Sequence, residues 1–164
     1  MNTTPILELS GVFKGYGNGA DRNEVLRGID LCVRTGEFLA ILGFSGTGKT
    51  MLINLMAGLA LPDAGTVHFR GVPVTGPGPE RGVVFQSYSL MPWLTVAGNV
   101  ALAVDAVHKA KPKAERAAMV AKYIGMVGLS HAMERRPAEL SGGMRQRVSV
   151  ARALAMTPGS AAAG

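Results

Sequence analysis

One short segment of the chain combines residue types that can hold phosphate groups. A phosphate-binding loop wraps its backbone N–H groups around phosphate oxygens, and glycines leave room for that approach. Lys49 can reach the outer phosphates, and the hydroxyl of Thr50 can bind Mg²⁺. The segment reads, in order, Gly43, Phe44, Ser45, Gly46, Thr47, Gly48, Lys49 and Thr50. These residues predict a site for a nucleoside triphosphate and its Mg²⁺ ion.

The elements on either side of this loop must position it. Phe38–Leu42 is a continuous apolar run, which predicts a strand buried on both faces of a parallel sheet. A helix is expected from about Gly48 to Ala57, ended by Gly58 and then Pro62. The alternative interpretation of this segment is an ordinary glycine-rich turn. A buried strand before the motif and a helix after it favour the phosphate loop.

A second phosphate-binding surface is indicated further along the chain. Ser141 can cap a helix whose first turn holds Gly142 and Gly143, so that free N–H groups and the positive helix end face outward. Simple N-capping by Ser141 also fits, but it does not explain both glycines. The apolar spacing that supports a helix here involves Met144, Val148, Ala151 and Ala155.

The remaining sequence separates into a β-rich part and a helical part. Short or alternating apolar segments predict strands at 6–9, 29–33 and 67–70, and a continuous run predicts another at Val83–Phe85. From Thr95 onward the periodicity is helical, and Gly128 predicts the end of a helix. The apolar stripe of that helix is Met119, Val120, Tyr123, Ile124 and Val127.

Composition narrows the class of protein. The chain has 164 residues, of which 48% are hydrophobic, and this suits one domain with a core. The only cysteine, Cys32, excludes an internal disulfide and fits a reducing cytosol, and no secretory signal pattern is expected at the N-terminus. The stretch Leu52–Leu61 is too short to cross a bilayer. The net charge of +6 suits a phosphate ligand or an anionic surface. The basic residues are scattered and have no aromatic residues between them, so we expect no nucleic acid partner.

Together with Tyr16 and Gln86, these motifs stand in the order found in the ATP-binding subunits of ABC transporters, and the chain resembles that family. The resemblance implies an α/β fold: a P-loop NTPase of the ABC cassette type, with an antiparallel β subdomain, a parallel core sheet and a helical signature subdomain. It also implies ATP and Mg²⁺ as ligands.

The resemblance assigns roles to individual residues. Tyr16 lies where the family places an aromatic ring that stacks on adenine, and Gln86 matches the Q-loop glutamine, which approaches Mg²⁺ and the attacking water. Ser141, Gly142 and Gly143 match the signature that contacts the γ-phosphate of the nucleotide held by a partner cassette. Taken alone, a tyrosine between glycines is more often a turn residue, and a glutamine after a strand is more often a surface residue.

Within the family, Pro77–Gln86 and Ser89–Val96 resemble the nitrate, sulfonate, taurine and bicarbonate importers, and Ala101–Asp105 and Phe44–Thr50 favour nitrate. This resemblance implies a second cassette and integral membrane permease subunits as partners, and a periplasmic or lipoprotein solute-binding protein as an indirect one. It implies a peripheral position on the cytoplasmic face of the membrane. The apolar residues 90–94 fit either a dock for the permease or a partly buried segment.

The resemblance ends at about Pro158. The family continues with an Asp that binds Mg²⁺ and a Glu that activates water, whereas this chain continues with Gly159–Gly164. We therefore expect a partial domain at 1–158, divided at residue 86, with a non-homologous tail and an incomplete parallel sheet around Phe38–Leu42. ATP binding is expected, but turnover by this chain alone is not. A non-catalytic regulatory module and a truncated gene product without function are the alternatives.

Two single positions also depart from the family. Met51 stands where the family usually has a second hydroxyl that contacts the α-phosphate. Gly98 stands three residues after Thr95 in place of an acidic residue, which removes a possible capping box.

Overall fold

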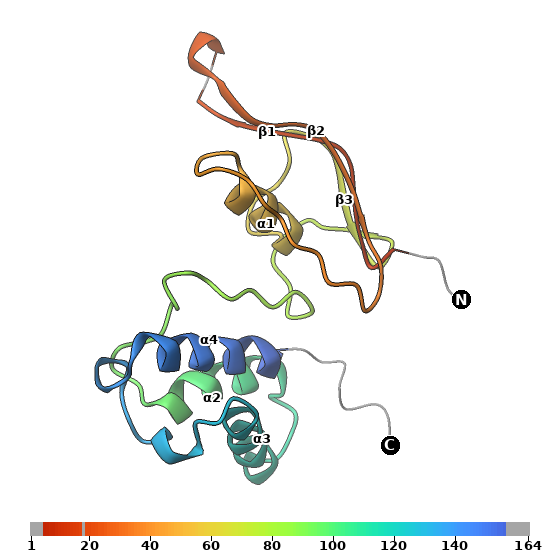
Figure 1. Cartoon of the computed structure of the whole chain (residues 1–164). Helices are drawn as coiled ribbons and strands as arrows, with labels where there is room; N and C mark the ends of the chain where they lie inside the picture. The colour runs from red at the N-terminus through yellow and green to blue at the C-terminus, as the bar shows by residue number, and fades with distance from the viewer. Residues whose placement is uncertain (1–4, 18, 157–164) are drawn as a thin grey trace. The chain divides into compact units, whose positions relative to one another are not determined.

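The computed structural model describes residues 5–17 and 19–156. The chain divides into two compact units, Met1–Gly78 and Pro79–Gly164 (Figure 1). Each unit has its own hydrophobic core. This division falls before residue 86, so Val83–Gln86 belongs to the helical unit and not to the β-rich one. The expected tail at 159–164 lies outside the described residues.

The first unit is built on a four-stranded antiparallel sheet. Its strands are β1 (Leu7–Tyr16), β2 (Asn23–Val33), β3 (Ala64–Phe69) and β4 (Val72–Pro73), in the order β2-β1-β3-β4. β1 and β2 form a long hairpin whose tip holds the 3-10 turn η1 (Gly19–Asp21) (Figure 1). The strands expected at 6–9, 29–33 and 67–70 are thus confirmed, and the first two extend well beyond those segments.

A single helix, α1 (Lys49–Ala57), packs against this sheet. It ends at Gly58, whose φ of 77° is left-handed and whose N–H donates to the carbonyls near the end of the helix. A Cβ at Gly58 would lie 2.1 Å from the carbonyl oxygen of Gly76, so no other residue fits there. The expected helix and its glycine stop are confirmed. The buried core of the unit consists of Leu9, Val12, Leu26, Met51, Leu55, Val67 and Val74.

Two predicted strands are wrong. Phe38–Leu42 and Val83–Phe85 have no regular strand structure, and Phe38 is 93% exposed and Leu42 90% exposed. A parallel strand is stable only when neighbours complete its hydrogen bonds and cover its faces. Within residues 5–17 and 19–156, every strand belongs to the antiparallel sheet and none pairs with Phe38–Leu42. The parallel sheet around Phe38–Leu42 was expected to be incomplete, and within the described residues no strand of it is formed.

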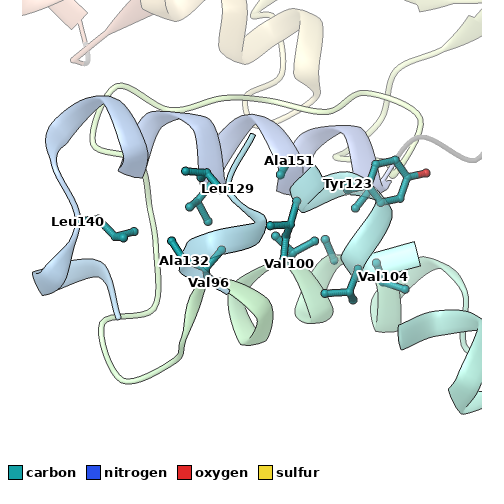
Figure 2. Close-up of a cluster of buried hydrophobic side chains, with 13 residues drawn as sticks. Val96, Val100, Val104, Tyr123, Leu129, Ala132, Leu140 and Ala151 are labelled. Atoms are coloured by element: carbon teal, nitrogen blue, oxygen red, sulfur yellow. The ribbon is translucent and has the colours of Figure 1, made fainter. Parts of the chain in front are cut away.

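The second unit is helical. Its helices are α2 (Val96–Val107), α3 (Lys113–Met126) and α4 (Gly142–Met156), with 3-10 turns η2 (Ser130–Ala132) and η3 (Pro137–Glu139) between α3 and α4. Their apolar side chains converge on one core (Figure 2). The predicted stripes are confirmed, because these residues are buried or pack against the core: Met119, Val120, Tyr123, Ile124, Val127, Met144, Val148, Ala151 and Ala155.

Polar groups fix the start of α2. Thr95 is the N-cap, and its hydroxyl accepts a hydrogen bond from the N–H of Gly98 at 3.1 Å. Asn99 is fully buried; its Oδ1 accepts from the N–H of Met91 at 2.8 Å, and its Nδ2 lies 3.1, 3.3 and 3.0 Å from the carbonyl oxygens of Met91, Leu94 and Thr95. The cap therefore forms without an acidic residue at position 98.

Candidate nucleotide-binding site

The phosphate loop is fixed against strand β2 by a glycine. Gly46 and Gly48 have φ values of 81° and 90°, a backbone conformation that side chains disfavour. A Cβ at Gly48 would lie 2.8 Å from Val25 Cγ1 and 2.9 Å from Leu26 Cδ2. Gly48 therefore brings the loop close to β2 and starts α1 at the same position. The loop motif did not indicate the roles of Val25 and Leu26, because their proximity to Gly48 depends on the tertiary fold.

The ammonium group of Lys49 is held inside the loop. Its Nζ donates to the carbonyl oxygens of Gly43 at 2.7 Å and Phe44 at 2.5 Å, and it lies 3.5 Å from the hydroxyl of Thr47. The Thr47 hydroxyl also donates to the Phe44 carbonyl at 2.9 Å. The loop thus surrounds a positive charge, as a site for phosphate requires.

The start of α1 adds backbone donors to this charge. Gly48 is the N-cap and offers no side-chain acceptor, so the first N–H groups of the helix have no capping partner. These groups and the positive helix end favour an anion. Thr50 lies exposed in the first turn.

The residues near the loop fit Mg²⁺ that arrives with a phosphate ligand. Mg²⁺ prefers oxygen ligands and is usually bound through few protein groups together with substrate phosphates. The exposed hydroxyl of Thr50 is one such oxygen. No group of three or more His, Cys, Asp or Glu side chains able to hold a metal occurs among residues 5–17 and 19–156. A preformed metal cage is thus not a feature of the described structure.

Tyr16 lies close to the helix that follows the loop. Its hydroxyl is 4.0 Å from the sulfur of Met51 in the first turn of α1, and the side chain is 57% exposed. Met51 itself is buried in the core of the unit, where it takes the place of the family's hydroxyl residue. The structure therefore brings the predicted aromatic residue and the phosphate-loop helix together.

An open depression of about 320 Å³ borders the loop. Its lining is mostly apolar and combines residues of β2, of the segment before the loop and of α1. The lining residues are Leu26, Ile29, Ile41, Leu42, Gly43, Phe44, Thr47, Gly48, Lys49 and Leu52.

The segment after Gln86 is attached to α4. Tyr88 and Ser89 have left-handed φ values of 62° and 49°, which few non-glycine residues adopt. The guanidinium of Arg145 lies 5.8 Å from the centre of the Tyr88 ring, and that of Arg152 donates to the carbonyl of Ser89. Burial lowers the pKa of the Arg152 guanidinium. Two residues of α4 thus fix the turn that directly follows Gln86, whose side chain is exposed.

The predicted cap of α4 is present. The hydroxyl of Ser141 accepts from the N–H of Met144 at 3.3 Å, and α4 begins at Gly142. A Cβ at Gly143 would meet nothing within 4 Å, and one at Gly142 would lie 3.5 Å from the Tyr88 hydroxyl, an ordinary contact. Because packing requires neither glycine, their presence agrees with a role at the exposed helix end.

The apolar segment 90–94 is partly core. Leu90 packs against the helical core, whereas Trp93 is 67% exposed. None of the described helices is long and apolar enough to cross a bilayer.

Tyr16 and the phosphate loop belong to the first unit, and Gln86 and Ser141–Gly143 belong to the second. Residues 26–160 match the sequence profile of ABC transporters, and the chain belongs to this family. The ABC cassette fold expected from the sequence is confirmed by solved structures. The ATP-binding cassette MJ0796, solved as a dimer bound to ADP and Pi, matches with a TM-score of 0.83 and 32% identity over 93% of this chain and 70% of that one.

A second solved structure, cbiO1 from Clostridium perfringens, described as part of the transporter complex cbiONQ, matches with a TM-score of 0.78 and 28% identity, covering 94% of this chain and 63% of that one. Both neighbours are cassettes of the same family. The antiparallel sheet and the helical unit are therefore parts of a known architecture.

The curated relatives belong to anion transport systems. The chain is 54% identical to the bicarbonate transport ATP-binding protein CmpC of Synechococcus elongatus over 141 residues, which are 86% of this chain and 21% of that protein. It is 47% identical to CmpD of Synechocystis, covering 96% of this chain and 56% of that one. It is 43% identical to the nitrate transport protein NasD of Klebsiella oxytoca, covering 94% and 59%. The chain spans less than two thirds of the length of these relatives.

Proposed function

We propose that this chain is the nucleotide-binding part of the ATP-binding subunit of an importer for nitrate or a related small anion such as bicarbonate. The observation that carries the proposal is the phosphate loop, in which Gly48 packs against β2 and the Lys49 ammonium is held among loop carbonyls. The names of the relatives support the choice of anion.

ATP binds with its phosphates on the loop and the N-terminus of α1. Lys49 neutralises the outer phosphates, Thr50 supplies a hydroxyl for Mg²⁺, and Tyr16 stacks on the adenine ring. Gln86 supplies a further oxygen ligand for Mg²⁺, as in the family's Q-loop. Bound Mg²⁺ neutralises charge on the β- and γ-phosphates.

The partners follow from the second phosphate-binding surface. The exposed N-terminus of α4, with Ser141, Gly142 and Gly143, contacts the nucleotide of a second cassette. The dimeric state of MJ0796 supports this pairing by analogy. Integral membrane permease subunits bind near the exposed Trp93, at the cytoplasmic face of the membrane, and a solute-binding protein acts through them.

The isolated chain binds ATP without turning it over. Hydrolysis needs, besides Gln86, a carboxylate that activates the attacking water. Among the described residues, the depression that borders the phosphate loop is lined by no Asp or Glu side chain. The non-catalytic regulatory module remains compatible with this property.

Calorimetric titration with Mg-ATP tests the proposal. Lys49→Ala should abolish binding, because the lysine faces the phosphates, and Gln86→Ala should leave it largely intact, because Gln86 serves the metal and water. The same samples should release no phosphate above background. Equal losses in both variants would contradict the assigned roles, and turnover that disappears in Lys49→Ala would reveal a catalytic acid that the proposal lacks.

A further inference from the structure

Asp63 joins three groups at the end of strand β1. One carboxylate oxygen lies 2.6 Å from Lys14 Nζ. The other accepts from the N–H of Gly15 at 2.9 Å and from the guanidinium of Arg22 at 2.6 Å. The backbone N–H of Asp63 donates to the carbonyl of Phe13 at 2.9 Å. The hydrogen bond from Lys14, followed by that from Gly15, lowers the pKa of the Asp63 carboxyl to about 2.

This carboxylate takes the place of a missing strand partner. The pairing of β1 with β3 ends at Phe13 and Ala64, so β3 offers no acceptor to the last residues of β1. On the other edge, the pairing with β2 continues to Tyr16 but shifts in register between Lys14 and Gly15. A Cβ at Gly15 would lie 2.8 Å from the carbonyl oxygen of Asn23, so this edge is tightly packed. Asp63 therefore holds the free edge of β1 immediately before Tyr16.

Tyr16 has few other constraints. Its side chain is 57% exposed, and its hydroxyl makes one long contact with the sulfur of Met51. The direction of the ring is thus set mainly by the backbone of residues 14–16, which Asp63 anchors.

We propose that Asp63 is a positioning residue for Tyr16, which presents the ring beside the first turn of α1 and so contributes to the preference for adenine nucleotides over bare polyphosphate. This inference rests on the proposed adenine-stacking role of Tyr16. Asp63 does not touch the nucleotide; it acts through the β1 backbone.

The test compares binding of ATP with binding of inorganic tripolyphosphate, both with Mg²⁺. Tyr16→Ala should lower the affinity for ATP roughly tenfold, since a base loses its aromatic partner, and should leave tripolyphosphate binding unchanged. Asp63→Ala should lower ATP affinity by roughly fivefold, again without effect on tripolyphosphate. Adding Asp63→Ala to Tyr16→Ala should change nothing further, because Asp63 acts through that ring.

Asp30 supplies a matched control. Its carboxylate also anchors β1, by accepting from the N–H of Gly11 at 2.7 Å, but at a site five residues before Tyr16. Asp30→Ala therefore removes a similar anchor and should leave the ratio of the two affinities unchanged. If Asp63→Ala does not fold, as judged by circular dichroism, Asp63→Asn serves instead. It keeps an acceptor for Gly15, loses both ion pairs, and should lower ATP affinity two- to threefold.

Failure of the stacking role of Tyr16 and failure of the positioning role of Asp63 would give different results. If Tyr16→Ala leaves the ratio of affinities unchanged, the adenine role of Tyr16 is wrong, and the positioning role of Asp63 is wrong with it. If Tyr16→Ala lowers ATP affinity alone while the Asp63 variant lowers both affinities equally or neither, the inference is overturned and the stacking role stands.

Discussion

Two physical constraints require a glycine at position 48, and the phosphate-loop motif does not distinguish them. Its φ of 90° disfavours any side chain, and the space for a Cβ is taken by Val25 and Leu26. Gly46 has a similar φ of 81° but open space around it. The two glycines of one loop therefore differ in physical cause: Gly46 permits a backbone conformation, and Gly48 also permits packing on β2.

This difference predicts unequal costs of substitution. Gly46→Ala should lower the free energy of unfolding of the first unit by about 1 kcal/mol, from backbone strain alone. Gly48→Ala should lower it by about 2–4 kcal/mol, because overpacking against β2 is added to the strain. Amide hydrogen exchange of β1 and β2, measured without nucleotide, reports the free energy of unfolding of this unit. Equal effects in the two variants would show that Gly48 is not pressed against β2.

At the scale of elements, the start of α2 depends on Asn99. One buried amide side chain holds the backbone of Met91, Leu94 and Thr95, and so fixes the segment that carries Trp93. A buried polar group of this kind is costly to remove, because its backbone partners lose their hydrogen bonds while still shielded from water.

Asn99→Leu should therefore destabilise the helical unit by about 2–3 kcal/mol and shift the fluorescence of Trp93, the only tryptophan. Ser149→Ala is the control, since Ser149 is the other buried polar residue in the described part of this unit. It should leave the Trp93 emission unchanged. An unaltered emission spectrum in Asn99→Leu would mean that the segment 91–95 is held by other contacts.

The elements that could be predicted from the sequence are those specified by local signals. Gly58 ends α1, Ser141 caps α4, and the apolar stripe of α3 lies in the core as its spacing indicates. The apolar run Phe38–Leu42 predicted a strand that does not form, because an apolar run becomes a strand only with partners, and the sheet around it was expected to be incomplete. Val83–Phe85 fails for the same reason.

The candidate site likewise has features that a local motif predicts and features that depend on the tertiary fold. The phosphate loop and its helix follow from a contiguous motif. The neighbourhood of Tyr16 and Met51 depends on how β1 packs beside α1, and the contacts of Asp63 join residues 41 to 49 positions apart. No local pattern in the sequence indicates such pairs.

At the scale of the whole molecule, the two units differ in how completely their elements are covered. The helices of the second unit enclose one core, while the first unit leaves Phe38, Leu42 and Phe44 exposed at 93%, 90% and 88%. Exposed apolar residues in a segment with unpaired backbone groups favour association.

We therefore predict weak protection from hydrogen exchange at Phe38–Leu42 in the isolated chain. Stronger protection is expected in α2, α3 and α4, whose backbone hydrogen bonds lie within each helix and whose apolar side chains are buried in one core. The chain should also associate as its concentration rises. Replacing Phe38 and Leu42 together with lysine should reduce light scattering, because it removes the exposed apolar side chains and adds charge. Val72→Lys is the control: Val72 is 66% exposed on β4, outside this segment, and its replacement should reduce scattering less. Strong protection of the Ala40 and Ile41 amides would show that this segment is paired in solution, and the structural account of its exposure would then be wrong.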